Sequence, residues 1–270
     1  MDKTEYLQEL NKAFKDFKFF PEDHHYEYKG NRIGISVTRL IEEYANEFNQ
    51  EEIAKRVAIK EEKTIQEVLD EWKYKNQFSC AKGSICHEFA QHLWSGNEWL
   101  WSGFGRDEYE NEIFYHTCDL IFEQAHNFYD DYKLVLEHIA DEFVIGSEEY
   151  DIASAVDHLF RNRHTNGLIL VDYKTNSYLT GYNKKSYKKP MKSPLKHLND
   201  DSLHHYYIQL SIYKYIIEKY TNLTIEEMFI VYMSENIENY EIIEIPYLKD
   251  EVEMILEWRK WEWKKIILLH

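Results

Sequence analysis

Two carboxylates and one lysine stand at the ends of two neighbouring apolar segments. Asp157 lies near the end of the segment 151–160, and Asp172 and Lys174 close the apolar run that begins at residue 167. Side chains alternate between the two faces of a strand, so Asp172 and Lys174 point to the same face. If Asp157 lies on the neighbouring strand, the two carboxylates converge beside the lysine at one edge of a sheet.

This combination suits hydrolysis of a phosphate ester. Two close carboxylates repel each other unless a cation lies between them, and Mg²⁺ or Mn²⁺ prefers such oxygen ligands. A bound divalent metal lowers the pKa of its water and offsets charge on the phosphate. Lys174 could orient or deprotonate the attacking water and stabilise the transition state. The alternative is a surface Asp–Lys pair that merely follows a core strand, because such pairs are common.

The elements that must position these residues follow from the hydrophobic periodicity. We expect strands over 135–146, 151–160, 167–173, 228–234 and 240–247, the third of them central because it is continuously apolar. We expect helices over 4–17, after the segment GISVT, within 50–76, from Gly83 to Gly96, and over 108–134, 203–220 and 249–268, with a polar turn at 19–31. This order predicts an α/β fold: a helical N-terminal region, 1–134, and a core, 135–270, integrated into one domain.

Composition sets further bounds. The 270 residues are 44% hydrophobic and 16% aromatic, which is enough for a packed core. Three cysteines cannot form a disulfide framework, and no apolar run approaches the roughly 18 residues of a membrane span. The N-terminal segment is charged from residue 2, so we expect a cytoplasmic protein with no membrane partner. The net charge of −17 is unusual for a nucleic-acid binder, unless positive charge is concentrated locally.

Further motifs stand in order along the chain. They are Gly83-Ser-Ile-Cys-His87, Glu142-Phe-Val, Asp151-Ile-Ala-Ser-Ala-Val-Asp157, Asp172-Tyr-Lys174 and Gln209-Leu-Ser-Ile-Tyr213. Together they resemble the PD-(D/E)xK nuclease superfamily, in its RecB-like branch, over roughly residues 33–235. The chain looks most like the small phage-encoded and mitochondrial genome-maintenance exonucleases. It departs from the usual Gly-Ile-Ala-Gly pattern, with Asp151 and Ser154 in place of the two glycines.

The resemblance implies a restriction-endonuclease-like core, a central mixed β-sheet flanked by helices. It implies that His87, Asp157, Asp172 and the Tyr173 carbonyl hold Mg²⁺ or Mn²⁺, and that Lys174 is the catalytic lysine. Gln209 and Tyr213, one helical turn apart, would steady Lys174 and the scissile phosphate. Glu142 would also belong to the site, although Glu137 likewise precedes a strand and an outer or structural role for Glu142 is open.

Two additions known from relatives are not expected here. No cysteine follows residue 118, which excludes the four-cysteine iron–sulphur cluster of some members. The chain also contains no GxxxxGK[ST] sequence, so the helicase motor of larger members is absent from it. The expectation is a stand-alone nuclease domain.

Positive charge gathers directly after Lys174. Residues 177–199 hold six lysines and no acid, interleaved with tyrosines. Lysine binds phosphate without reading sequence, and tyrosine can stack on unpaired bases. We therefore expect a DNA-guiding loop, with a solvated, disordered loop as the alternative. The residues expected to contact DNA are Lys184, Lys185, Lys188, Lys189, Lys192, Lys196, Tyr182 and Tyr187.

The expected activity is metal-dependent hydrolysis of DNA, by an exonuclease that acts on single strands or free ends in phage or bacterial replication, recombination or repair. An endonuclease with the same site is one alternative, and a catalytically silent DNA-binding module is another. The sequence leaves polarity, the choice between DNA and RNA, the physiological metal, oligomeric state and protein partners open.

Overall fold

The chain has an α/β fold built on a six-stranded mixed sheet. The computed structural model describes residues 2–99, 104–105, 107–184 and 189–268, with side chains as far as Trp261. The sheet has the order β4-β6-β7-β8-β9, and β5 also pairs with β6. β4–β6 and β7–β8 are parallel pairs, and the others are antiparallel. The strands are β4 (Ile35–Ser36), β5 (Leu136–Ser147), β6 (Ile152–Asn162), β7 (Leu168–Lys174), β8 (Ile225–Tyr232) and β9 (Glu241–Glu244).

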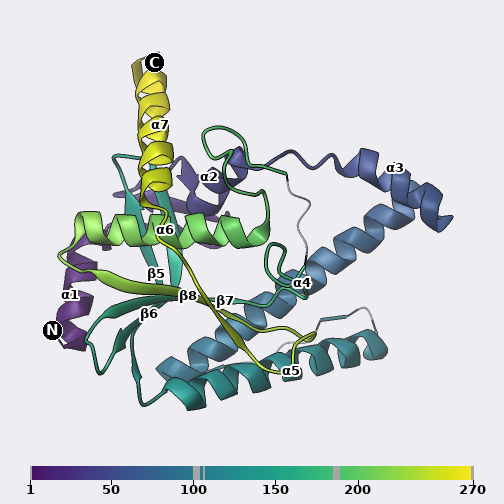
Figure 1. Ribbon diagram of the computed structural model, residues 1–270, viewed down its shortest axis with the longest axis horizontal. Helices are drawn as coiled ribbons and strands as arrows, with labels where there is room; N and C mark the ends of the chain where they lie inside the picture. The colour runs from purple at the N-terminus through teal and green to yellow at the C-terminus, as the bar shows by residue number, and fades with distance from the viewer. Residues whose placement is uncertain (1, 100–103, 106, 185–188, 269–270) are drawn as a thin grey trace.

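Helices cover both faces of this sheet (Figure 1). On one face, α1 (Lys3–Phe14), α2 (Val37–Tyr44), α6 (Ser202–Tyr220) and α7 (Lys249–Leu268) share a core with the sheet. On the other, α4 (Ile65–Ser95) and α5 (Glu108–Tyr132) pack on it. β7 is buried on both faces, as its continuous apolar sequence predicted: Leu168 and Leu170 join the first core, and Ile169 and Val171 the second.

The long helix α4 differs from the prediction. We expected a helix to begin at Gly83, but α4 passes straight through this residue and begins just after Thr64, whose side chain forms a capping box with Glu67. Its predicted end at Gly96, in the left-handed conformation, is correct. The charged stretch 50–76 divides into α3 (Gln50–Glu61) and the start of α4, because Glu62 adopts a φ of 54° and ends the first helix. α3 and the first part of α4 project from the body (Figure 1).

The N-terminal region is not purely helical. Where we predicted a polar turn, the chain forms an antiparallel sheet of β1 (Phe17–Phe20), β2 (His25–Tyr28) and β3 (Asn31–Arg32). Alternate aromatic side chains give this segment a buried face: Phe17 and Tyr26 lie in the core. β4 also belongs to the N-terminal region, yet it pairs with β6 in the main sheet. The main sheet therefore takes strands from both sides of residue 134.

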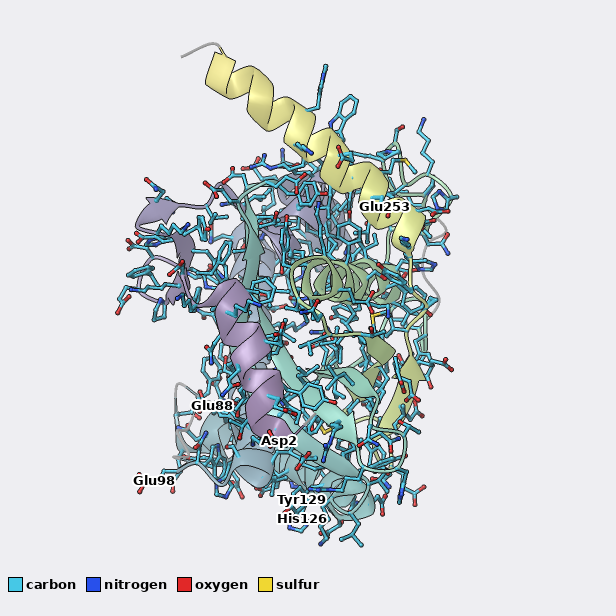
Figure 2. All side chains as sticks on the ribbon, turned by 90° about the vertical axis from the view of Figure 1, so that its left-hand side faces the viewer. Asp2, Glu88, Glu98, His126, Tyr129 and Glu253 are labelled. Atoms are coloured by element: carbon cyan, nitrogen blue, oxygen red, sulfur yellow. The ribbon has the colours of Figure 1, made fainter. Side chains whose placement is uncertain are left out.

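The two ends of the described chain differ in their packing. α1 begins after Asp2, which forms a capping box with Glu5, and its residues Tyr6 and Leu10 are buried. α7 begins in the core and then extends beyond the packed side chains of the body (Figure 2). In the described part of the chain, no helix is long and apolar enough to cross a membrane.

Candidate active site

Three acidic residues form a row across adjacent strands. His158 pairs with Val171 in the antiparallel β6–β7 register, which places Asp157 opposite Asp172. In β5–β6, Asp141 pairs with His158 and Phe143 with Val156, so Glu142 lies opposite Asp157. The sheet thus brings together three carboxylates that are up to 30 positions apart in sequence, and Asp157 and Asp172 converge as the sequence predicted.

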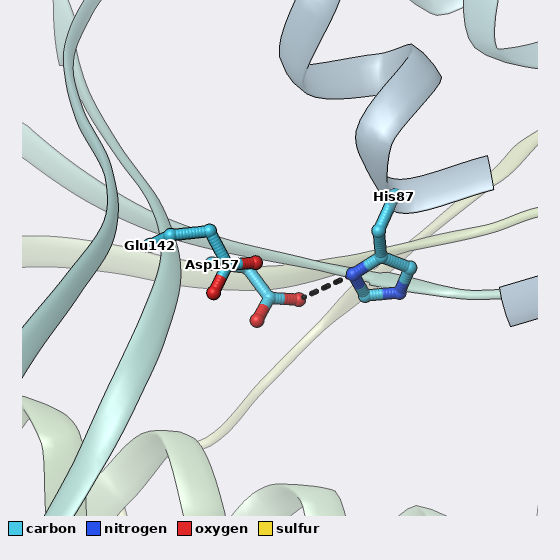
Figure 3. Close-up of side chains that lie close together, drawn as sticks. All are labelled: His87, Glu142 and Asp157. Atoms are coloured by element: carbon cyan, nitrogen blue, oxygen red, sulfur yellow. Dashed lines mark ion pairs between the residues drawn. The ribbon is translucent and has the colours of Figure 1, made fainter. Parts of the chain in front are cut away.

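His87 reaches this row from α4. One ligand atom each from His87, Glu142 and Asp157 lie within 4.8 Å of one another (Figure 3). Nδ1 of His87 is 3.3 Å from Oδ2 of Asp157, an ion pair when the imidazole is protonated. Glu142 has a φ of 43°, a backbone conformation that non-glycine residues rarely adopt and that often marks functional sites.

The alternative glutamate lies elsewhere. Glu137, near the start of β5, forms an ion pair with Arg161 at 2.6 Å. A register shift in β5 between His138 and Ala140 separates Glu137 from the segment that carries Glu142. Of the two glutamates that the sequence offered, Glu142 is the one beside Asp157.

The electrostatics of the row are those of crowded carboxylates. Burial and the adjacent charge of Asp157 raise the pKa of Asp172 well above its usual range. Burial and Asp157 likewise raise the pKa of Glu142 to about 7. Burial also raises the pKa of Asp157, but His87 and the other neighbours outweigh it and hold that pKa well below its usual range. Without a cation, Asp172 and Glu142 therefore hold their protons more readily than free carboxyl groups do.

These residues fit a divalent cation. The candidate donors are carboxylate oxygens and one imidazole nitrogen, a set that suits Mg²⁺ or Mn²⁺. Oδ2 of Asp157 is buried and accepts no hydrogen bond from any described residue, although Nδ1 of His87 is near. A cation among His87, Glu142 and Asp157 would satisfy this atom and reduce the repulsion within the row. Asp172, which is paired with Lys174, stays a predicted ligand.

Lys174 is held between an acid and an aromatic ring. Its ammonium donates to Oδ1 of Asp172 at 2.8 Å and lies 2.6 Å from Oδ2. The same ammonium lies 4.6 Å from the centre of the Tyr206 ring. Burial lowers the pKa of Lys174, but the charges of Asp172 and Asp157 outweigh burial and raise it, so the lysine is a cation.

Tyr206 is a site residue that our sequence analysis missed. It lies on α6, three positions before Gln209 and therefore on a neighbouring part of the same helix surface. Its hydroxyl donates to Oδ1 of Asn176, two residues beyond Lys174. Only the spacing from Gln209 could have suggested it.

Gln209 and Tyr213 lie on α6 and form hydrogen bonds that lead to β6, the strand that carries Asp157. Gln209 Nε2 donates to the Tyr213 hydroxyl at 2.8 Å, and that hydroxyl is 2.9 Å from the Ser154 hydroxyl on β6. Ser154 stands where the resembled pattern has its second glycine, so this departure adds a hydrogen bond. The other departure, Asp151, accepts from the Gly34 amide at 2.7 Å and from Arg259 at 2.9 Å. Both substitutions therefore join the sheet to surrounding elements.

Tyr173 lies between Asp172 and Lys174 and points to the opposite face. Its hydroxyl accepts from the Trp94 indole nitrogen at 2.9 Å, and its ring packs edge-on against His158. The carbonyl of Tyr173 stays a predicted ligand.

The basic loop begins beside the site. A cavity of about 340 Å³ is lined by His87, Lys174, Asn176, Tyr178 and Lys184 among others. The Lys184 ammonium lies 5.4 Å from the Tyr178 ring centre, and both side chains line this cavity. Tyr182 is exposed and packs edge-on against Tyr232, 6.1 Å away.

The rest of the loop is anchored in its described part. The amide of Lys192 donates to the Tyr44 carbonyl, and Met191, Leu195 and Leu198 are buried. Lys189, Lys192 and Lys196 are exposed. Lys185, Tyr187 and Lys188 lie outside the described residues.

Comparison with known proteins adds little. No protein family model matches the chain, and no curated protein does. A solved structure described as the crystal structure of SSO0001 is similar over 56% of this chain and 60% of that chain, at 16% identity and a TM-score of 0.28. A match of this size carries no information on the activity of this chain.

Proposed function

We propose that the chain is a metal-dependent DNA nuclease of the PD-(D/E)xK type with a restriction-endonuclease-like core. One observation carries the proposal: Glu142, Asp157 and Asp172 lie in a row on three adjacent strands, with His87 and Lys174 beside them. Three carboxylates so close together repel one another, and the burial of Asp172 adds a desolvation cost, which a structural role alone does not explain. The order of motifs along the chain supports the same assignment.

Each residue has a role in this proposal. His87, Glu142, Asp157 and Asp172 would hold Mg²⁺ or Mn²⁺, which supplies an activated water and offsets phosphate charge. Lys174, fixed by Asp172 and Tyr206, orients the attacking water and stabilises the negative charge that develops on the phosphate. Gln209 and Tyr213 support the sheet under the site.

The proposed substrate is DNA, either single-stranded or at a free end. Lys184 and Tyr178, which line the cavity beside Lys174, would receive the strand on one side of the scissile phosphate. The chain as a whole is acidic, so its attraction for phosphate rests on this local group of lysines.

The test uses end-labelled single- and double-stranded oligonucleotides together with linear and circular DNA, each with Mg²⁺, Mn²⁺ or excess chelator. We expect metal-dependent product ladders from linear substrates and intact circles. Asp172→Asn should abolish cleavage and weaken Mn²⁺ binding, whereas Asp119→Asn, at an exposed position of α5, should change neither. Cleaved circles would identify an endonuclease, and full activity in chelator or in Asp172→Asn would refute the proposed site.

A further inference from the structure

A second cavity lies on the other side of His87. Its volume is about 610 Å³, and it opens between the β1–β2 turn, α4 and β5. His87 and Glu142, both in the candidate metal cluster, line it together with Phe19, Pro21, Glu88 and Gln91. The cluster therefore lies between two cavities, because His87 also lines the one that contains Lys174 and Lys184.

The N-terminal hairpin gives this cavity a rigid aromatic wall. Phe19 is backed by the ring of Tyr26, with ring centres 4.9 Å apart, and by the edge of His24 at 5.2 Å. The Tyr26 hydroxyl accepts from the amide of Ala155, two residues before Asp157. The hairpin is thereby attached to the strand that carries a candidate metal ligand.

Close packing against β5 reinforces this attachment. A Cβ atom on Gly146 would lie 2.4 Å from the Phe17 ring, so the absence of a side chain there lets the hairpin approach the sheet. The hairpin therefore packs on both β5 and β6, and this packing fixes the position of Phe19 relative to Glu142. A binding site requires side chains held in this way.

The two cavities differ in charge. Lys174 and Lys184 give the first a cationic lining that suits phosphate. The residues that line the second include the acidic Glu88 and neither lysine nor arginine, while Phe19 offers a stacking face. A carboxylate such as that of Glu88 accepts hydrogen bonds from the edges of bases, and an amide such as that of Gln91 both accepts and donates them. An unpaired base is therefore the part of a nucleic acid that the second cavity fits.

We propose that this cavity binds one unpaired base of the nucleotide next to the scissile phosphate, stacked on Phe19. The inference rests on the proposed nuclease function and deepens it. It makes the β1–β2 hairpin a substrate-binding element, and it predicts a requirement for single-stranded DNA, since a paired base could not enter the cavity.

The test scans a single abasic position along a single-stranded oligonucleotide and measures kcat/KM and, by fluorescence anisotropy without cleavage, affinity. In wild type, an abasic site at one position next to the cut should lower the affinity and kcat/KM by about 5- to 150-fold, the value of one stacked base. Phe19→Ala should lower both values by the same factor for the intact oligonucleotide, and the abasic site should not lower them further. Phe19→Trp should restore the discrimination.

Phe20→Ala is the matched control, because Phe20 is the next residue of the same strand and stacks on His25. It should discriminate abasic from intact strands as wild type does. The inference would be overturned if every abasic position gave the same kcat/KM and affinity, or if Phe19→Ala still distinguished abasic from intact strands. If the protein cleaves no substrate but binds intact strands through Phe19, the proposed nuclease function is refuted and the base-binding cavity is supported. If it cleaves DNA but treats abasic and intact strands alike, the nuclease function is supported and the base-binding cavity is refuted.

Discussion

The ammonium of Lys174 lies 4.6 Å from the centre of the Tyr206 ring while it contacts both carboxylate oxygens of Asp172. A lysine is a flexible side chain, and two partners from different elements remove that freedom. Asp172 comes from the same strand, but Tyr206 comes from α6. Through the Tyr206 ring, the position of α6 therefore helps to determine the position of the Lys174 ammonium.

Tyr206 should therefore act as a positioning residue for Lys174. Tyr206→Leu should lower kcat by about 2- to 30-fold, the range of a cation–π contact in a partly desolvated site. Tyr206→Phe retains the ring and should stay near wild type. Mn²⁺ affinity and KM should be unchanged in both variants. A parallel loss of stability and metal binding in Tyr206→Leu would instead indicate a merely structural residue.

Lys184 and Lys189 are exposed lysines of the basic loop. Changing both to alanine should weaken binding of single-stranded DNA equally for all sequences and reduce the log–log salt slope by up to about 1.4. Binding isotherms at several salt concentrations measure the slope. The pair Lys3→Ala and Lys12→Ala, exposed on α1, provides the charge-matched control. If both double variants behave alike, the loop makes no specific contribution to the DNA path.

The buried Lys82 forms an ion pair with the partly exposed Glu235, which joins α4 to the segment after β8. Their charged atoms are 2.8 Å apart, and only 2% of the Lys82 side chain is exposed. Glu235→Gln leaves the ammonium unpaired and should lower the free energy of unfolding by about 3–5 kcal/mol. Adding Lys82→Met should recover most of this loss, since no buried charge remains. Urea unfolding measures both, with Glu238→Gln at an exposed position as control. Equal stability of Glu235→Gln and wild type would show that water reaches Lys82.

His158 should make folding sensitive to mild acid. Burial lowers its pKa to about 3, against about 6.5 in an unfolded chain. Between these values the unfolded state binds the additional proton, so stability is complete above pH 6.5 and decreases as the pH falls. His158→Phe should flatten this dependence by up to about 1.4 kcal/mol per pH unit. Denaturant titrations from pH 7 to pH 4 test it, and the exposed His116→Gln should keep the wild-type slope. A slope in His158→Phe that matches wild type would mean that the imidazole is charged in the fold.

Much of the fold could be predicted because local signals were strong. The five expected strands and the helices at 108–134, 203–220 and 249–268 all occur, with shifted ends. The β1–β2 hairpin could not be predicted, because Pro21, Glu22 and Asp23 look like an ordinary turn and the flanking strands are only four residues long. Gly83 suggested a helix start, but packing of the long helix outweighs the roughly 1 kcal/mol that an interior glycine costs.

The sequence by itself determined that Asp172 and Lys174 share a face, because the alternation of side chains along a strand is local geometry. It also placed the candidate motifs in order. Only the tertiary structure decided that Glu142 lies opposite Asp157, since the register shift at His138 moves the pairing by one residue. The same holds for Tyr206 over Lys174 and for Phe19, which lines the same cavity as His87. These arrangements bring together residues far apart in the chain, and they follow from how sheets and helices pack, which no local pattern encodes.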